Sequence, residues 1–465
     1  MPAERTELPE GVVVAWYGDD FTGSAAVMEA MTFAGLPSVL FLGVPDAETR
    51  EAFQGYRGVG IAGVARSRSP EWMKRELPPV FEALATLDAP VNHYKICSTL
   101  DSAPHLGSIG QAIDLAVPIL GGRWHPLLVA APAIGRYQSF GNLFAVASGQ
   151  VYRLDRHPTM RHHPVTPMGE ADVRLHLSKQ TRRKIGLIDL LALRESEQAD
   201  SALKAQLDSG SEIIALDVMD DRSLAACGEL IWKNRGERLF TVGSQGIEYA
   251  LIAYWRSTGA IGPAPATAGV GRVERIVVAS GSCSPDTAAQ IAWARGHGFQ
   301  SVRVRVELAV DPAAWAGELD RLATQACDMV GQGVDPLLLT AEGPNDPSIA
   351  AFKEAVAACG GDTQEINARL GTGLGTVLGR VLSQTKLKRG ILAGGDTSGY
   401  GAMALRIEAL TALAPTVPGA ALFKAHGRNP LIPGLEIALK GGQMGTPDYF
   451  QWIKSGGGPS LNRSI

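Results

Sequence analysis

One repeated pattern constrains the fold of this chain: a short apolar run, a polar or glycine-bearing turn, then a helical pattern. The first copy combines the run at 12–16, the turn Tyr17-Gly-Asp-Asp-Phe-Thr-Gly23 and a helical segment at 24–34. Short apolar runs bounded by turns favour buried strands, and strands that alternate with helices favour a parallel sheet. We therefore predict an α/β fold with mainly parallel sheets flanked by helices.

The chain is too long for one ordinary hydrophobic core. At 465 residues, two or three domains are expected. Residues 258–272 are small residues, proline and glycine without periodicity, which is typical of a linker. We predict an N-terminal domain over 1–257, a linker over 258–272 and a C-terminal domain over 273–465.

Charge and cysteine content argue against several classes of partner. The net charge is −4 and no basic block occurs, so neither nucleic acid nor an anionic membrane is an expected partner. The first ten residues lack the blocks of a signal peptide, and no apolar run is long enough to span a bilayer. The five cysteines lack metal-binding or redox spacing. A cytoplasmic location with reduced thiols is expected.

The first turn carries two adjacent carboxylates, Asp19 and Asp20. In open α/β sheets, ligands bind in the crevice beyond the carboxyl ends of the strands. Two carboxylates there suit a sugar hydroxyl, a metal ion or a general base. Asp and Thr in such a turn also suit a helix cap, so both interpretations stay open.

Cationic residues follow other predicted strands of the first half. In or beside these turns lie Arg66, Arg68, Lys95, Asp101 and Arg136. If the strands are parallel, these groups gather at one sheet edge with the two aspartates. Such a cluster fits a small hydroxy acid whose carboxylate is held by arginine, although ordinary surface ion pairs would give the same pattern.

Two other patterns in the first half are weaker. Gly58-Val-Gly-Ile-Ala-Gly63 matches a dinucleotide fingerprint as a string, but it looks like a strand itself and no helix follows it. Residues 140–185 look irregular, and their proline-rich loop holds His157, His162 and His163. No carboxylate or cysteine completes a known ligand spacing, so no metal site is predicted.

The second half has three turns suited to phosphate. They are Ser280-Gly-Ser-Cys-Ser284, Gly394-Gly-Asp-Thr-Ser-Gly399 and Lys440-Gly-Gly-Gln-Met-Gly445, each after a predicted strand. Glycine lets the backbone approach a phosphate, and amides at a helix start supply donors. Ser284 and Pro285 suit the cap and first position of a helix, and a further helix is predicted over 400–413. Nucleotide binding is therefore predicted, without a Walker-type loop.

Together these motifs resemble the four-carbon acid sugar kinase family. The likeness rests on six segments: Gly18-Asp-Asp-Phe-Thr-Gly23, Tyr94-Lys-Ile-Cys-Ser-Thr-Leu-Asp-Ser102, His163-Pro-Val-Thr-Pro-Met168, Ser280-Gly-Ser-Cys-Ser284, Gly394-Gly-Asp-Thr-Ser-Gly399 and Ala438-Leu-Lys-Gly-Gly-Gln-Met-Gly445. They occur in family order across nearly the whole chain.

The resemblance implies a sugar-acid-binding N-terminal domain, a nucleotide-binding C-terminal domain and an active site in the cleft between them. The implied reaction is ATP-dependent phosphorylation of the terminal C4 hydroxyl of a tetronate or 3-oxo-tetronate, with Mg²⁺ bridging the ATP phosphates. The resemblance is also compatible with a homodimer.

The resemblance also implies roles for individual residues. Asp20, or Asp19, would be catalytic, and Arg68, Lys95 and Asp101 would bind the substrate. The implied nucleotide-binding residues are Ser280, Ser282, Gly394, Gly395, Asp396, Thr397, Gly441 and Gly442. No residue is assigned to a metal.

This chain departs from the family pattern at several positions. Gly18 replaces Ala, Leu100 replaces Phe, residues 104–108 differ, and Gly441-Gly-Gln-Met444 replaces Ser-Gly-Asn-Phe. The departures after Asp101 lie on the substrate side, so the identity of the acid sugar stays open.

Two other functions remain. A ribokinase-like sugar kinase would use Asp396 as its base, because Gly394-Gly-Asp-Thr397 resembles that family's Gly-Ala-Gly-Asp turn. The linked Asn-x-x-Glu motif is absent. A non-catalytic sensor of sugar acid and nucleotide would bind both ligands without turnover.

Overall fold

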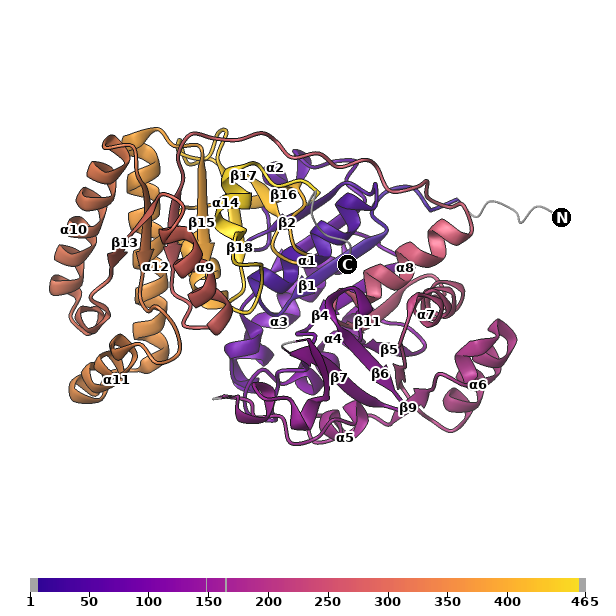
Figure 1. Cartoon of the computed structure of the whole chain (residues 1–465). Coiled ribbons are helices and arrows are strands. Elements are labelled where there is room, and N and C mark those ends of the chain that lie inside the picture. Colours follow the sequence, from indigo (N-terminus) through magenta and orange to yellow (C-terminus); the bar gives the residue numbers. More distant parts are fainter. Residues whose placement is uncertain (1–6, 148, 164, 460–465) are drawn as a thin grey trace. The chain divides into compact units, whose positions relative to one another are not determined.

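The computed structural model describes residues 7–147, 149–163 and 165–459. Pro164 of the histidine-containing motif and residues 1–6 lie outside these ranges. The chain divides into two compact units, Met1–Pro265 and Ala266–Ile465 (Figure 1). This division falls within residues 258–272, a segment without helix or strand.

The first unit is built on a sheet in which every neighbouring pair of strands is parallel. In spatial order its strands are β2 (Ser38–Phe41), β3 (Gly58–Ala62), β1 (Val14–Gly18), β4 (Val91–Lys95), β11 (Leu239–Gly243), β5 (His125–Leu128), β10 (Ile213–Leu216) and β9 (Ile185–Ile188). The predicted first strand, 12–16, is displaced by two residues, but its turn and the following helix are in place.

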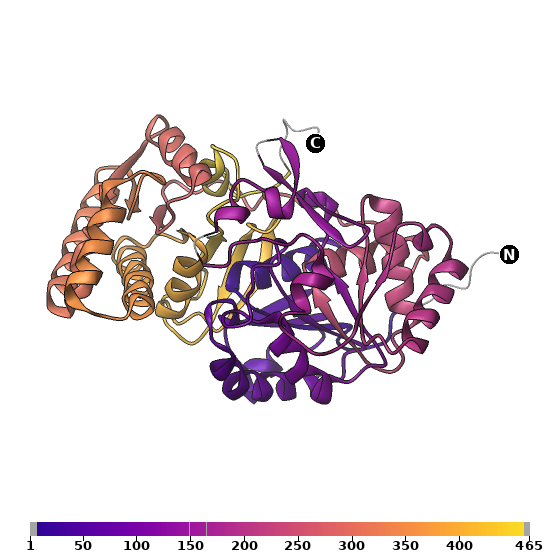
Figure 2. The same cartoon turned by 90° about the horizontal axis from the view of Figure 1, so that it is seen from below.

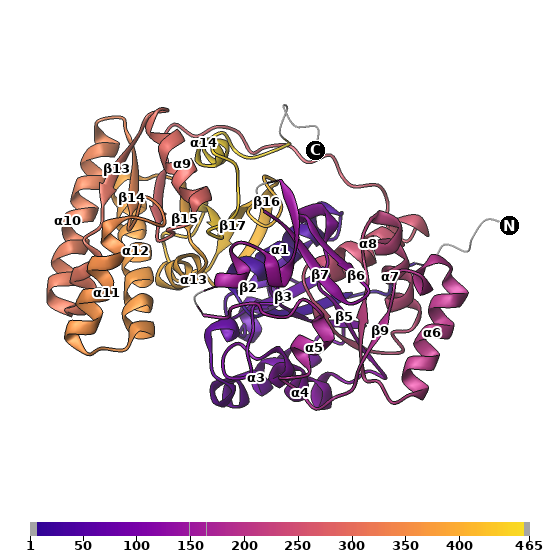
Figure 3. The same cartoon turned by 60° about the horizontal axis from the view of Figure 1, so that its bottom comes forward.

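Helices cover both faces of this sheet. They are α1 (Phe21–Phe33), α2 (Ala47–Glu51), α3 (Pro70–Ala85), α4 (Ile109–Leu120), α5 (Val173–Leu177), α6 (Ser196–Asp208), α7 (Asp221–Lys233) and α8 (Gly246–Ser257). Ala15 and Tyr17 of β1 pack into the core that contains α3 and α4. The intervening Trp16 donates from its indole to the Ser24 carbonyl of α1 at 3.2 Å. Figure 3 shows α3 and α4 together on one face and α7 and α8 on the other.

The glycines that imitate a dinucleotide fingerprint have a packing role. A Cβ on Gly60 would lie 2.1 Å from the Trp16 ring, and one on Gly58 would lie 2.3 Å from the Ser38 hydroxyl. Gly58–Ala62 is strand β3, followed by the short 3₁₀ turn Ala65–Ser67. Glycines are needed at Gly58 and Gly60 because Trp16 covers the strand there. As predicted, the string is itself a strand and no α-helix directly follows it.

The prediction that 140–185 is irregular is wrong for its first part. A separate antiparallel sheet joins β6 (Arg136–Ser139), β7 (Asn142–Ala147) and β8 (Gln150–Arg153). Its alternation of buried and exposed residues is short, and proline nearby obscures it. The remainder up to β9 holds short 3₁₀ turns and α5.

The second unit has a mixed sheet. In spatial order its strands are β13 (Phe299–Arg303), β14 (Asp335–Leu339), β12 (Val277–Ser280), β15 (Arg389–Ala393), β18 (Glu436–Lys440), β17 (Leu422–His426) and β16 (Ala409–Ala414). The strands from β13 to β18 pair in parallel, whereas β17 pairs antiparallel with both β18 and β16.

The helices of this unit are α9 (Pro285–Arg295), α10 (Pro312–Gly331), α11 (Pro347–Cys359), α12 (Thr363–Thr385), α13 (Gly395–Ala404) and α14 (Tyr449–Lys454). Helices α10 and α12 pack against each other, and Figure 2 shows the salmon and orange helices of this unit grouped together. Ser284 caps α9 through its hydroxyl and Pro285 takes the first helical position, as predicted. Helices α2, α4, α5, α6, α11 and α14 have no counterpart among the sequence-based predictions.

The predicted helix at 400–413 is wrong in both bounds. Helix α13 begins at Gly395 and ends at Ala404, after which Arg406 adopts a left-handed φ of 56°. Residues 409–414 are then strand β16, although Ala and Leu favour helices. Pairing with β17 overrides that propensity.

The predicted α/β class, with mainly parallel sheets flanked by helices, is confirmed. Among the described residues, none of the helices combines the length and the apolar character needed to cross a membrane.

Candidate active site

The two aspartates occupy the turn between β1 and α1. Asp20 caps the helix: its Oδ1 accepts from the Gly23 amide at 3.0 Å and its Oδ2 from the Thr22 hydroxyl at 2.7 Å. The cap interpretation is therefore correct for Asp20. A cap leaves part of the carboxylate available, and this side chain is 21% exposed whereas that of Asp19 is 2% exposed.

Arg66 binds both carboxylates. Its Nη2 lies 2.6 Å from Asp19 Oδ1 and 2.8 Å from Asp20 Oδ1, and its Nε donates to Asp19 Oδ2 at 3.2 Å. The Arg66 amide also donates to the Asp19 carbonyl at 3.0 Å. This two-point contact fixes the pair in one orientation.

The pKa values of the two carboxyl groups are shifted in opposite directions. Burial raises the pKa of Asp19 although Arg66 opposes it, and the nearby charge of Asp20 adds to the rise. Burial acts on Asp20 in the same way, but Arg66, Lys95 and the Thr22 hydroxyl outweigh it and hold the pKa of Asp20 below its usual range. Asp20 is therefore ionised at neutral pH, and it is the more accessible of the two.

Lys95 ends β4 directly beside this turn, in register with Gly18 of β1. It is 2% exposed, and its ammonium donates to the Ile96 carbonyl at 2.8 Å. A Cβ on Gly23 would lie 2.9 Å from its Nζ, so the first turn of α1 covers it. Burial lowers the pKa of Lys95, while Asp20 and Asp19 oppose that shift.

The other predicted residues sit at the same edge. Arg68 lies over the Trp72 ring, 5.6 Å from its centroid, and the Arg136 Nη1 donates to the Ile134 carbonyl at 3.1 Å. The Nε atoms of both arginines are buried without a hydrogen-bond partner in the described structure. Asp101 accepts from the Thr99 hydroxyl at 2.8 Å. Burial lowers the pKa of Arg136, and Cys97 and Asp101 counteract it.

The segment after Asp101 supports the arginine turn. The Gly107 amide donates to the Arg68 carbonyl at 2.9 Å, and a Cβ on Gly107 would lie 2.4 Å from the Arg66 carbonyl. Gly107 also has a positive φ of 59°. The segment that departs from the family pattern thus sets the backbone position of Arg66 and Arg68.

In the second unit, the three glycine turns are neighbours. Ser280 of β12 is in register with Ala393 of β15, and Ala393 is in register with Lys440 of β18. The three strands are parallel, so the turns that follow them meet at one carboxyl edge. All the predicted nucleotide-binding residues lie in these turns.

These turns approach each other too closely for side chains at Gly281 and Gly442. A Cβ on Gly281 would lie 2.0 Å from the Thr397 hydroxyl, and one on Gly442 would lie 2.9 Å from the Ser282 hydroxyl. Gly394 has a φ of 117°, which favours glycine. Gly395 and Asp396, by contrast, are exposed at the start of α13.

A hydroxyl cluster connects two of the turns. The Thr287 hydroxyl lies 3.0 Å from the Ser282 hydroxyl and 3.0 Å from the Gly442 carbonyl, to which Ser284 also donates. Lys440 reaches the same cluster. Thr287 and Lys440 were not among the predicted site residues. Two sequence signals could have found them. Thr287 lies three residues after the helix cap Ser284, and Lys440 ends an apolar run.

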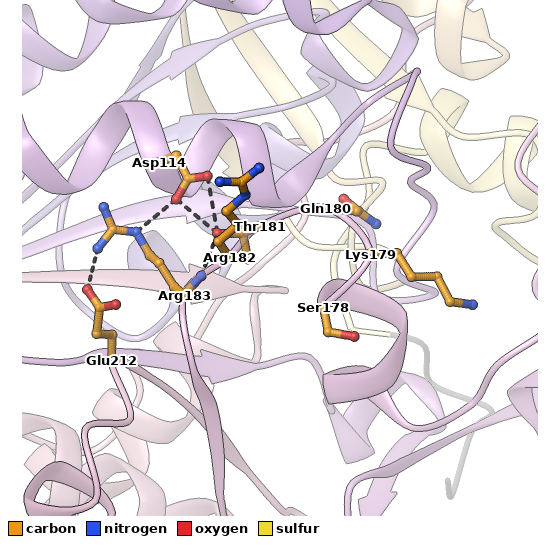
Figure 4. Close-up of a pocket in the computed structure, with 8 residues that line it drawn as sticks. All are labelled: Asp114, Ser178, Lys179, Gln180, Thr181, Arg182, Arg183 and Glu212. Carbon is orange, nitrogen blue, oxygen red and sulfur yellow. Dashed lines mark hydrogen bonds and ion pairs between the residues drawn. The ribbon is translucent and has the colours of Figure 1, made fainter.

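A cavity of the first unit lies elsewhere. It measures about 650 Å³ and is lined by Asp114, Ser178, Lys179, Gln180, Thr181, Arg182, Arg183 and Glu212 (Figure 4). Arg183 lies two residues before β9 and Glu212 directly before β10, so this cavity opens at the amino edge of the sheet. Arg183 pairs with Asp114 at 2.8 Å and with Glu212. The cavity is therefore separate from the aspartate turn.

Comparison with known proteins identifies both halves. Residues 14–251 match a family described as the sugar-binding N-terminal domain, and residues 277–450 match the nucleotide-binding C-terminal domain. The chain belongs to the four-carbon acid sugar kinase family. It is accordingly an ATP-dependent kinase, as the resemblance implies.

Two curated relatives align over almost the whole length. A 3-oxo-isoapionate kinase of Paraburkholderia graminis is 46% identical over 97% of this chain and 96% of its own length. A 3-oxo-tetronate kinase of Brucella melitensis is 27% identical over 97% of both chains.

Solved structures share the fold. A Salmonella typhimurium protein superposes with a TM-score of 0.76 at 24% identity, covering 95% of this chain and 98% of its own. A Haemophilus influenzae protein gives a TM-score of 0.69 at 21% identity, covering 95% and 99%.

Proposed function

We propose that this kinase transfers the γ-phosphoryl group of ATP to a terminal hydroxyl of a 3-oxo acid sugar bound at the aspartate turn. The observation that carries the proposal is Asp20, an ionised and partly exposed carboxylate beside Arg66 and Lys95. The bond from the γ-phosphorus to the bridging oxygen breaks, a bond to the sugar hydroxyl oxygen forms, and the hydroxyl proton passes to the Asp20 carboxylate and from there to solvent. ADP is the second product.

Asp20 orients the attacking hydroxyl. Its lowered pKa makes it a weak base but a good hydrogen-bond acceptor, which suits a reaction that depends mainly on positioning. Asp19 is more deeply buried and holds Arg66 in place, so it acts through Arg66. Lys95 supplies positive charge beneath the two aspartates.

Arg68 and Arg136 hold the substrate carboxylate. Each has a buried Nε without a hydrogen-bond partner in the described structure, and an unpaired buried donor is costly. A substrate carboxylate would satisfy such a donor with a charge-assisted bond. Asp101 then accepts from a hydroxyl of the same acid sugar.

The three glycine turns hold the ATP phosphates. Ser280, Ser282 and Thr397 contribute hydroxyl groups, and Gly394, Gly395, Gly441 and Gly442 contribute close backbone approach. Among the described residues no three His, Cys, Asp or Glu side chains gather as a metal site. Mg²⁺ typically takes phosphate, water and one or two carboxylate ligands in such sites. The exposed Asp396 is the carboxylate of these turns and would contact it.

An Asp396→Asn variant separates this assignment from the ribokinase-like alternative. We expect weaker binding of Mg²⁺-ATP and lower turnover, with acid sugar affinity unchanged, because the carboxylate near the metal is lost. Calorimetric ATP affinity and turnover should be measured on the same protein. Normal ATP affinity with loss of only the chemical step would instead assign Asp396 as the base.

The substrate is proposed to be 3-oxo-isoapionate rather than 3-oxo-tetronate. The relative named for the former is 46% identical, whereas the relative named for the latter is 27% identical. The altered segment at 104–108, which supports the arginine turn, is on the substrate side. A coupled assay of ADP formation with both compounds, and with tetronates, tests this choice. Absence of ADP formation with every acid sugar would favour the sensor alternative.

We also expect a cytoplasmic location, where ATP is available, and a homodimer. Light scattering of the purified protein tests the second expectation.

A further inference from the structure

Lys440 is a buried charge that the proposed mechanism does not use. It ends β18 with a fully buried side chain. Its ammonium donates to the carbonyl oxygens of Gly441 at 2.8 Å and Gly442 at 3.3 Å, and to the Thr287 hydroxyl at 3.1 Å. A lysine with only neutral partners is rare in a protein core, because burial disfavours its charge.

The backbone of Lys440 connects to the third turn. Its carbonyl accepts from the Gly394 amide at 2.7 Å and from the Ser398 hydroxyl at 3.3 Å. Thr287 belongs to α9, and its hydroxyl bonds to Ser282 of the first turn at 3.0 Å. Lys440 therefore contacts two of the glycine turns directly and reaches the first through Thr287. A change at this position therefore affects the whole phosphate-binding edge.

The contacts of the ammonium fix the direction of the Gly441–Gly442 peptide, and together with Ser284 and Thr287 they fix that of the Gly442–Gln443 peptide. No cis peptide occurs in the described chain, and in a trans peptide the carbonyl and the following N–H point in opposite directions. The Gly441 and Gly442 carbonyls point toward the buried ammonium. The amides of Gly442 and Gln443 consequently point away from it, and neither has a recorded partner among the described residues.

We propose that Lys440 is a positioning residue for ATP, holding the Gly441 and Gly442 carbonyls inward so that the Gly442 and Gln443 amides face a phosphate group. Successive amides of this kind form a cradle for anions. The inference rests on the proposed function, because it requires the three turns to bind ATP.

Phosphate binding should also change the protonation of Lys440. Burial lowers the pKa of Lys440 to about 7, and Asp286 of α9 opposes the shift. Its other contacts, from Thr287 on α9 and from the Gly441 and Gly442 carbonyls, are neutral. A bound phosphate adds negative charge and favours the ammonium form. Nucleotide binding above pH 7 is thus coupled to uptake of a proton.

The test is calorimetric titration with Mg²⁺ and a non-hydrolysable ATP analogue at pH 8, in two buffers of different ionisation enthalpy. The wild-type protein should take up a fraction of a proton on binding. Lys440→Met should lose that uptake and bind about 10- to 100-fold more weakly, as expected for lost hydrogen bonds to a charged group. Lys440→Arg, which stays charged, should lose the uptake but retain more of the affinity. Acid sugar affinity should not change in either variant.

Lys424→Met is the matched control, because Lys424 is exposed on β17 and should leave both readouts unchanged. Wild-type affinity or retained proton uptake in Lys440→Met overturns the inference. If Lys440→Met does not fold, the other two proteins decide. Proton uptake by the wild type that is lost in Lys440→Arg supports the inference. No uptake by the wild type, or uptake retained in Lys440→Arg, overturns it. A wild-type protein that binds no nucleotide refutes the proposed function itself, which is a distinguishable outcome.

Discussion

The carboxyl edges of the two sheets have the same geometry but different chemistry. In the first unit, long charged side chains meet: Asp19, Asp20 and Arg66 form one ion-paired group, with Lys95 beneath it. In the second unit, glycines, hydroxyls and backbone groups meet around a single buried lysine. A hydroxy acid has few atoms and needs side chains that reach them. A polyphosphate has many oxygens and is held best by backbone amides at close approach.

This difference makes the two edges sensitive to different substitutions. Removal of a charge should impair the first edge, whereas addition of volume should impair the second.

The largest effect is expected from Asp20→Asn. Asn caps a helix almost as well as Asp, so the cap on α1 should survive, while loss of the ion pair with Arg66 should lower stability without unfolding the protein. Turnover should fall about 10²–10⁴-fold, the usual contribution of a group that manages the reacting proton. Asp46→Asn is the matched control, since Asp46 caps α2 in the same way. Near-normal turnover in the Asp20→Asn variant would mean that Asp20 serves only as a helix cap.

Arg68→Lys tests the carboxylate clamp. Lysine keeps the charge but loses the planar fork, so the KM for the acid sugar should rise about 10-fold or more. The KM for ATP should stay at its wild-type value. Steady-state kinetics with each substrate varied in turn will show whether only the KM for the acid sugar rises. Equal changes in both KM values would contradict a role in substrate binding alone.

Gly281→Ala tests the close approach of the glycine turns. The added Cβ would lie 2.0 Å from the Thr397 hydroxyl, so α13 must shift. ATP affinity should fall several-fold, about 1 kcal/mol or more for an overpacked site. Gly317→Ala on α10 is the control, because its Cβ meets open space. Unchanged ATP binding in Gly281→Ala would show that the turn tolerates volume.

The last effect is on stability rather than on turnover or binding, and its sign is opposite to that on function. The pKa of Lys440 is about 7 in the folded protein, against 10.5 for the ordinary side chain. The cost of burying the charge is complete below pH 7 and disappears as the pH rises toward 10.5. Lys440→Met should therefore raise Tm at pH 6. The gain in the free energy of unfolding should shrink by about 1.4 kcal/mol per pH unit between pH 7 and pH 10.5.

Thermal unfolding monitored by circular dichroism at pH 6, 8 and 9.5 checks this dependence. A Tm that falls equally at each pH would show that the packing of Lys440, rather than its charge, dominates.

Much of the fold could be predicted because its signals are local. The apolar runs ending at the three glycine turns, and the Ser284 cap followed by Pro285, depend on neighbouring residues and appear where expected. The turn of Asp19 and Asp20 was also predicted, since it follows a strand and precedes a helix. Its assignment as a catalytic site remains a prediction.

Tertiary pairing decided the rest. Residues 409–414 have helical propensity but form β16, because β17 offers an antiparallel partner. The small sheet from β6 to β8 was missed for a similar reason: its strands are short and are stabilised by each other.

The amino-acid sequence by itself determined where strands end and helices begin, since caps, glycines and apolar runs act over a few residues. Only the tertiary structure decided that Arg66 binds both aspartates, and that Lys440 contacts two glycine turns and reaches the third through Thr287. Those contacts join residues tens or hundreds of positions apart. The order of parallel strands brings them together, and that order depends on packing of the whole sheet.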